Sequence, residues 1–226
     1  MNPTILNTDQ YLTHYWSFDN SQMLDQIGTA HMTQGSSAFF TTDRFGCPNS
    51  ALALNGGWTQ VLSGIYFDTL EFTISVWVYP QQLSNGARVI DFGNGQSLDN
   101  IFLAISQLFS SPNFQIYNGT TRVVPLYGPS SKRFALCQWQ LLTVTFNSKI
   151  NSSIIYINGQ SIASSNKNYN PPNINRTKCY IGKSNWASDG YSWSYLDDLR
   201  FYNKCLNQSE ILILVNNSSE YIYFYF

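Results

Sequence analysis

Charged side chains are scarce in this sequence, and the two signs nearly balance. Only 11% of the 226 residues are Asp, Glu, Lys or Arg, and the formal net charge is −1, whereas about a quarter of the residues in a typical soluble domain are charged. The longest basic run is Lys132-Arg133. The chain therefore lacks the basic stripe of nucleic-acid-binding proteins, and we expect no nucleic-acid partner.

Long apolar runs are also missing. No window approaches the ~18–20 apolar residues that span a bilayer, and Ile211–Val215 is too short, so no membrane insertion of this domain is expected. Met1–Thr4 has neither the charged region nor the apolar region of a signal peptide. Either the chain is cytosolic, or it is one module of a longer secreted or membrane-anchored protein.

Asparagine sequons favour the second of these two alternatives. Asn-x-Ser/Thr motifs also arise by chance in Asn-rich chains, but their number here predicts N-glycosylation and an extracellular or cell-surface location. The acceptor positions are Asn118, Asn151, Asn175, Asn207, Asn216 and Asn217.

The four cysteines lack the C-x-x-C spacing of zinc sites. They are Cys47, Cys137, Cys179 and Cys205. One or two disulfides fit an extracellular chain, and three full pairings exist. The alternative is four buried thiols that act as small apolar side chains.

Carboxylate pairs of the kind that glycosidases need are not evident. Such enzymes hold two carboxyl groups ~5–10 Å apart, but the chain has only three glutamates, all far apart. Asp197 and Asp198 are adjacent, which predicts that they point to opposite faces of a strand. His14 and His31 have no convincing nucleophile motif beside them. We therefore predict that the protein is not an enzyme.

Short alternating segments are what the sequence has in abundance. In Glu71–Tyr79, for example, Phe72, Ile74, Val76 and Val78 share one face, and turn residues separate this segment from others like it. Asn158-Gly159 is a strong hairpin signal, and only residues 207–215 look helical. The pattern predicts one all-β domain, an antiparallel sandwich over about residues 11–215, with a lead at 1–10 and a tail at 216–226.

The order of these segments resembles the laminin-G-like branch of the concanavalin A-like lectin/glucanase superfamily. Each block is weak alone, but seven occur in the family's order. The blocks are His14–Asp19, Phe72–Pro80, Arg88–Gly95, Gln138–Thr145, Ile155–Gly159, Tyr180–Gly182 with Leu196–Asn203, and Ser209–Ile211. The resemblance implies a jelly roll of two antiparallel sheets, often with a concave face that recognises sugar or protein, and in many members a calcium ion near a sheet edge.

This resemblance suggests a structural calcium site at Asp19, Asp25 and Asp197. Period two places Asp197 on the face of Leu199 and Phe201, with no Lys or Arg beside it, and a carboxylate there needs a partner. Calcium prefers such oxygen ligands. The alternative is that these aspartates cap backbone amides in turns.

Sugar recognition needs aromatic platforms beside planar polar groups. The stretch 186–195 supplies both, with Trp186, Asp189, Tyr191 and Trp193, and Trp58 lies in a second Gly-rich segment. The rings could instead only cover a sheet end. The sequence thus predicts an extracellular, non-catalytic binding module for glycan or protein partners. The alternatives are a structural spacer in a large surface protein and, less favoured, a glycoside hydrolase.

Overall fold

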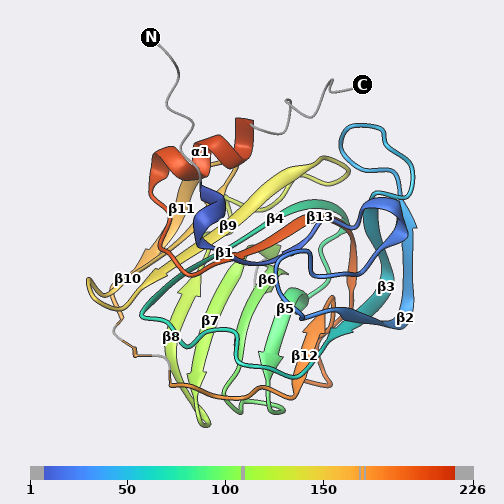
Figure 1. Cartoon of the computed structure of the whole chain (residues 1–226). Helices are drawn as coiled ribbons and strands as arrows, with labels where there is room; N and C mark the ends of the chain where they lie inside the picture. Colours follow the sequence, from blue (N-terminus) through green and yellow to red (C-terminus); the bar gives the residue numbers. More distant parts are fainter. Residues whose placement is uncertain (1–7, 108–109, 168, 171, 217–226) are drawn as a thin grey trace.

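The protein folds into antiparallel strands that form a jelly-roll-like sandwich, as predicted (Figure 1). The computed structural model describes residues 8–107, 110–167, 169–170 and 172–216. The strands are β1 (Leu12–Trp16), β2 (Met32–Thr41), β3 (Ala51–Val61), β4 (Glu71–Gln82), β5 (Ala87–Gly93), β6 (Ile101–Ser106), β7 (Asn113–Asn118), β8 (Thr121–Tyr127), β9 (Gln140–Asn147), β10 (Ser152–Ile157), β11 (Gln160–Ser165), β12 (Lys178–Ile181) and β13 (Ser192–Tyr202). The helical segments are η1 (Thr8–Tyr11), η2 (Asp19–Ser21) and α1 (Gln208–Asn216).

The strands form one continuous hydrogen-bonded path that folds over on itself. Its order is β11-β10-β9-β4-β13-β3-β12-β5-β6-β7-β8, while β1 pairs with β13 and β2 pairs with β3. The half from β12 to β8 makes one layer, and the half from β11 to β3 makes the other (Figure 1). The last strand, β13, therefore lies in the middle of the path.

One apolar core lies between the two layers. Alternation in β4 places Phe72, Ile74, Val76 and Val78 in this core, as the sequence predicted. Burying each such side chain stabilises the fold by about 1.5–3 kcal/mol. Trp16 is also fully buried, and its indole nitrogen donates to a backbone carbonyl at 2.9 Å.

The outer face of the β9–β4 half is covered by α1. A second apolar cluster there consists of Trp77, Leu141, Tyr156, Tyr202, Leu206, Ile211 and Leu214. The helix begins with a reciprocal cap, in which the Glu210 amide donates to Asn207 Oδ1 at 3.0 Å and the Asn207 amide donates to Glu210 Oε2 at 2.8 Å. The helix-like segment predicted at residues 207–215 is confirmed.

Two strands, β2 and β8, were not predicted from the sequence. Most of β2 faces solvent with Ser, Thr, Gln and Gly, so it shows no apolar alternation. β8 contains Pro125, which is tolerated because β8 ends the hydrogen-bonded path. The hairpin at Asn158-Gly159 is confirmed, with φ of +50° and +73°, as a two-residue turn of the favoured kind requires.

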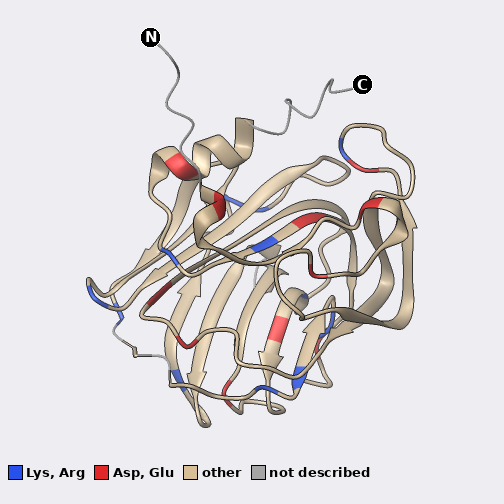
Figure 2. Ribbon diagram, viewed as in Figure 1, with Lys and Arg blue, Asp and Glu red and all other residues tan. Residues whose placement is uncertain are grey.

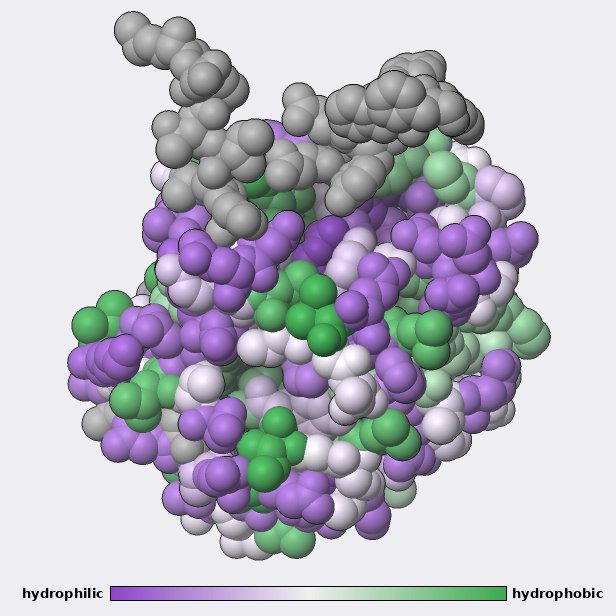
Figure 3. Space-filling model, in the orientation of Figure 1, coloured by the Kyte–Doolittle hydropathy of each residue, from purple (hydrophilic) through white to green (hydrophobic). Residues whose placement is uncertain are grey.

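Charge and apolar area are both dispersed over the surface. The few charged residues of both signs are spread along the ribbon (Figure 2), and on the visible face the apolar patches are scattered among hydrophilic side chains (Figure 3). No helix among the described residues has the length and apolar character needed to cross a membrane.

Candidate functional site

The candidate site lies on the outer face of the layer β12-β5-β6-β7-β8. Tyr180, Asp91, Phe102 and Gln115 stand opposite one another on four adjacent strands. Leu103, which follows Phe102, is in the core, so this row of side chains points away from the core.

A register shift in β5 brings Arg88 and Asp91 to that outer face together. Residues three apart in a regular strand point to opposite faces. Here the register shifts between Arg88 and Ile90, and both Val89 and Ile90 lie in the core. The irregularity thus places a cation and a carboxylate side by side on one face.

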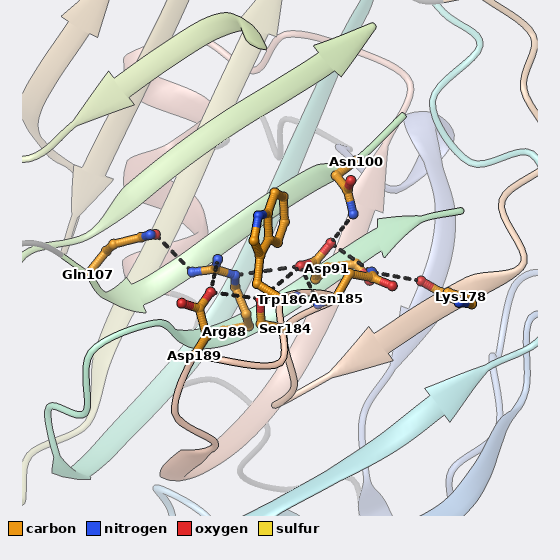
Figure 4. A network of polar contacts seen from close by, with 9 residues as sticks. All are labelled: Arg88, Asp91, Asn100, Gln107, Lys178, Ser184, Asn185, Trp186 and Asp189. Atoms are coloured by element: carbon orange, nitrogen blue, oxygen red, sulfur yellow. Dashed lines mark hydrogen bonds and ion pairs between the residues drawn. The ribbon is translucent and has the colours of Figure 1, made fainter. Parts of the chain in front are cut away.

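Arg88 is the centre of a polar network (Figure 4). Its Nη1 donates to Gln107 Oε1 at 2.8 Å, and its Nη2 donates to Asp189 Oδ2 at 2.6 Å. Its Nε lies 3.7 Å from Asp91 Oδ2, and its guanidinium carbon lies 3.9 Å from the centroid of the Phe102 ring. The side chain is fully buried, so its orientation is fixed by these contacts.

Asp91 anchors the network beneath the site. Its carboxylate accepts hydrogen bonds from Asn100 Nδ2 at 2.8 Å, from the Asn185 amide at 2.9 Å and from Asn185 Nδ2 at 3.0 Å. Complete burial raises the pKa of Asp91, while the Arg88 guanidinium and these amide donors oppose the rise. A buried carboxylate with this many donors holds its neighbours in one arrangement.

The loop of residues 183–191 is fastened to this network. Ser184 Oγ donates to Asp189 Oδ2 at 2.8 Å, and the Trp186 amide donates to Ser184 Oγ at 3.1 Å. Gly86 has φ of +82°, and a Cβ at that position would lie 2.5 Å from the Asp189 side chain. Only glycine allows the loop to approach the turn before β5 so closely.

Trp186 is thereby held above the sheet as a half-buried platform. Its ring centroid lies 5.6 Å from that of Phe102 and 5.5 Å from that of Tyr117. Both separations fall within the range of favourable aromatic pairs. The ring keeps its place by packing as well as by the loop's hydrogen bonds.

A pocket of about 130 Å³ opens between this platform and the strands. It combines aromatic faces with amide, guanidinium and carboxylate groups, which suits small polar ligands with apolar faces. Within this lining, Arg122 Nη1 donates to the hydroxyl of the exposed Tyr127 at 2.7 Å. The lining residues are Arg88, Phe102, Gln107, Gln115, Tyr117, Arg122, Tyr127, Trp186 and Asp189.

Two of the five ligand-binding residues predicted from the sequence line this pocket, namely Trp186 and Asp189. Trp58 lies instead against Tyr180, at 5.5 Å between ring centroids. Tyr191 and Trp193 are partly exposed outside the pocket, and the Trp193 ring packs on Gly56. The structure therefore divides the predicted aromatic set between different places.

Seven pocket residues were not predicted. Phe102, Gln115 and Tyr117 belong to strands that the sequence did predict, and their alternation with core residues was the available signal. Arg88 lies within the apolar strand β5, where a charged residue indicates a buried pair, and Gln107 directly follows β6. Tyr127 and Arg122 lie in β8, which the sequence did not predict.

Asp25 does not have the free oxygens that a calcium ligand needs. Its carboxylate contacts His14 Nδ1 at 2.6 Å and accepts from the backbone amides of Tyr15, Ile27, Gly28 and Ala30 at 3.0–3.2 Å. Burial raises the pKa of Asp25, but the hydrogen bonds from His14 and the amides outweigh it and hold the pKa well below its usual range. Asp25 therefore caps a loop, which was the alternative interpretation.

The predicted orientation of Asp197 is wrong. Asp198 has φ of +52°, and the register of β13 shifts between Asp197 and Arg200. Leu196 and Leu199 are both in the core, so the bulge takes Asp197 off their face. The prediction that Asp197 and Asp198 point to opposite faces is also wrong, because both carboxylates contact one guanidinium, that of Arg44.

Asp197 and Asp198 form a clamp around the Arg44 guanidinium. Burial and the neighbouring Asp198 raise the pKa of Asp197 to about 8. Burial also acts to raise the pKa of Asp198, but Arg200 and Arg44 outweigh it and lower that pKa. Tyr15 and Arg200 contact the remaining Asp198 oxygen. Arg44 thus occupies the space between the two carboxylates.

The three aspartates predicted to bind calcium do not fit that ion. No group of three His, Cys, Asp or Glu in the described residues is arranged to hold a metal. Arg44 supplies the positive charge that Asp197 was expected to lack, and Asp25 has its own five donors. Asp19 lies in η2. It acts on Asp197 electrostatically, but in the described part of the chain no hydrogen bond joins it to Asp25 or Asp197.

The cysteines and sequons occupy varied surroundings. The four thiols are free; Cys179 is buried, whereas Cys47 and Cys137 are exposed, so the alternative of four buried thiols is wrong. The acceptors Asn118, Asn151, Asn175, Asn207 and Asn216 are all exposed. Asn217 lies outside the described residues.

Comparison of the sequence with family models finds one match, described as the concanavalin A-like lectin/glucanases superfamily, over residues 54–212. A search of the curated proteins finds no match to the chain.

Solved structures share the fold at low sequence identity. Domain 4 of AbnA, a GH43 extracellular arabinanase from Geobacillus stearothermophilus solved with arabinotriose, has 21% identity and a TM-score of 0.73 over 90% of this chain and 98% of that domain. The binding domain of Paraclostridial mosquitocidal protein 1 has 18% identity and a TM-score of 0.68 over 93% of this chain. The binding domain of botulinum neurotoxin DC, solved with SialylT, has 17% identity and a TM-score of 0.69 over 94%. The chain spans 53% of each toxin domain.

Proposed function

This chain belongs to the concanavalin A-like lectin/glucanases superfamily, and we propose that it is a non-catalytic module that binds carbohydrate in the pocket beneath Trp186. The observation that carries the proposal is the fixed aromatic platform beside buried polar groups on the outer face of β5–β8. Sugars present apolar C–H faces and hydroxyl groups, and these two surfaces meet the two kinds of lining.

The size and charge of the pocket limit the range of ligands that it can bind. At about 130 Å³ it is smaller than the roughly 300–1,000 Å³ of sites for drug-sized molecules, so it suits one sugar unit or the end of a chain. Arg88 already has its carboxylate partners, while Arg122 has a tyrosine hydroxyl. Neutral oligosaccharides therefore fit, and the arabinotriose complex of the arabinanase domain makes arabino-oligosaccharides the first ligands to test.

A titration with arabinotriose, followed by a glycan panel, tests the proposal. Trp186→Ala and Tyr127→Ala should weaken binding of the best glycan about tenfold or more, equivalent to ~1.4 kcal/mol. Trp193→Ala is the matched control, because that ring is exposed outside the pocket, and it should bind like the wild type.

The outcomes separate the competing functions. Equal losses in the Trp186 and Trp193 variants would place the site elsewhere. Absence of binding to every glycan in the panel would favour a structural spacer or a protein partner. Hydrolysis of any polysaccharide in the panel would show an enzyme, against the Arg44 clamp that closes the Asp197–Asp198 pair.

We also propose that the module works outside the cell, as part of a larger secreted or membrane-anchored protein. The exposed sequon asparagines support this, since oligosaccharide transfer requires an accessible side chain. Expression in a eukaryotic secretory host should give a mass increase that peptide-N-glycanase removes. An unmodified mass from that host would contradict glycosylation.

A further inference from the structure

Arg176 is a fully buried arginine at the start of the segment that leads into β12. Its backbone pairs with that of Gly64 through two hydrogen bonds of 2.9 and 3.0 Å. Its side chain is 0% exposed, and the guanidinium carbon lies 5.7 Å from the centroid of the Phe67 ring, which belongs to the core. The charge thus lies inside the sandwich rather than on the outer face that carries the pocket.

Only one side of the guanidinium has an acceptor. Nε donates to the Asp99 carbonyl oxygen at 2.9 Å, whereas Nη1 and Nη2 are buried without an acceptor in the described part of the chain. No carboxylate there forms an ion pair with Arg176. By contrast, Arg44 and Arg88 each contact two carboxylates.

The groups that act on Arg176 electrostatically are Tyr169, Cys179 and, more weakly, the Asp99 carboxylate, which forms no ion pair with it. Tyr169 is buried, and its hydroxyl also has no partner among the described residues. Burial raises the pKa values of Tyr169 and Cys179 to about 12 each, although Arg176 opposes both rises. Both groups are therefore protonated at neutral pH. The side chain of Asp99 accepts from the Gly119 amide at 2.7 Å instead.

An arginine stays protonated in proteins, and a buried cation without a counter-charge is strongly unfavourable. We infer that Arg176 Nη1 and Nη2, with the Tyr169 hydroxyl, form an internal site for a small inorganic anion of the size of chloride. The two side chains supply three buried donors without a partner, and Arg176 acts on the Tyr169 hydroxyl electrostatically. This site is independent of the proposed carbohydrate function, since none of its residues lines the pocket.

The inference predicts that chloride stabilises the folded state. An anion that binds only the native protein raises its stability in proportion to ln(1 + [L]/Kd). For a domain of this size we expect the melting temperature to rise by about 3–5 °C for each tenfold increase in chloride above its Kd. Melting should be followed by circular dichroism in mixtures of sodium chloride and sodium gluconate at constant ionic strength.

Two variants assign the effect to this site. Arg176→Met should melt at the same temperature in chloride and in gluconate. Arg122→Met is the matched control, because Arg122 is exposed and has Tyr127 as its partner, and it should keep the full chloride dependence. Superimposable wild-type curves, or a chloride dependence that survives in Arg176→Met, would overturn the inference.

A second measurement is needed if Arg176→Met does not fold. Tyr169→Phe removes only a hydroxyl, and it should reduce the chloride dependence while the protein stays folded. Crystals grown in sodium bromide should show an anomalous peak within hydrogen-bond distance of Arg176 Nη1 and Nη2. A bromide-grown crystal with no peak there would also overturn the inference.

Discussion

The two outer faces of the sandwich use the same chemistry in different ways. On the face that carries α1, the Arg44 guanidinium bridges Asp197 and Asp198. On the opposite face, the Arg88 guanidinium bridges Asp91 and Asp189. Each face thus holds an arginine that contacts two carboxylates.

The surroundings of Arg44 and of Arg88 differ. The Arg44 guanidinium carbon lies 4.2 and 5.0 Å from the centroids of the Phe45 and Trp77 rings, and its side chain is only 9% exposed. Arg88 lies at the wall of a pocket, and one of its partners belongs to the loop that holds Trp186. The comparison teaches that a buried ion pair indicates a binding site only where an open, aromatic-lined cavity adjoins it.

The largest loss of stability is expected when the contacts of Arg44 with Asp197 and Asp198 are removed. Arg44→Met leaves two buried carboxylates with less positive charge, so we expect unfolding free energy to fall by about 3–5 kcal/mol. Urea denaturation measures the loss. Adding Asp198→Asn to this variant should recover part of the stability, since it removes the carboxylate that stays charged at neutral pH. A loss below about 1 kcal/mol for Arg44→Met would contradict the clamp.

Asp189→Asn, on the face that carries the pocket, should change both the stability of the protein and its affinity for glycan. The variant removes a charged partner of Arg88 and of Ser184, which should lower the unfolding free energy by about 1–3 kcal/mol. It should also weaken glycan binding, because the loop that holds Trp186 loses its anchor. Ser188→Ala, at an exposed position in the same loop, is the control for both. Normal glycan affinity in Asp189→Asn would show that the anchoring of this loop does not contribute to glycan binding.

Asp25 should contribute less to the stability of the fold, and its contribution depends on pH. Its pKa in the folded state lies below the unfolded value of about 3.9, so the unfolded chain takes up the proton more readily. The carboxylate therefore stabilises the fold at neutral pH, and this stabilisation is lost as the pH falls below about 4.

Denaturation from pH 7 to pH 2 tests that sign. Asp25→Asn should be less stable than the wild type by about 1–3 kcal/mol at pH 7, and the difference should shrink as the pH falls. A difference that stays constant over this range would mean that ionisation of Asp25 is not what stabilises the loop.

Of these changes, the addition of calcium should alter the stability of the protein least. Calcium binding remains a prediction from the family resemblance, but the contacts of Asp25 and Asp197 lead us to expect none at these residues. Metal-stripped protein should melt at the same temperature with calcium and with EGTA. A rise with calcium that Asp197→Asn abolishes would show that Arg44 yields its place to the ion.

The fold could be predicted from the sequence more fully than the site. Strands with apolar alternation, such as β4, were visible because one face of each meets the core. The strands β2 and β8 were missed because an edge strand has few core positions to show. The bulges in β5 and β13 were missed because period two assumes a regular strand, and each one changed which residues meet.

The site depended on those irregularities and on contacts distant in sequence. Arg88 and Asp189 are 101 positions apart, and no spacing rule connects them. Trp186 and Asp189 could be predicted because the loop is dense in aromatic and polar residues. Trp58 and Trp193 share that composition, but Trp58 packs against Tyr180 and the Trp193 ring lies over Gly56, both outside the pocket. Composition alone therefore does not say which aromatic ring lines a pocket.

The central place of β13 has a consequence for synthesis of the chain. Residues 192–202 are near the C-terminal end of the described chain, yet β13 lies between β4 and β3. Until the ribosome has released this segment, β3 and β4 each present an unpaired edge, and such edges are sites of aggregation. The strands β5 to β8 follow one another as hairpins and can pair early. The nascent protein can therefore pair β5 to β8 early, but both layers are completed only when β12 and β13 have been made.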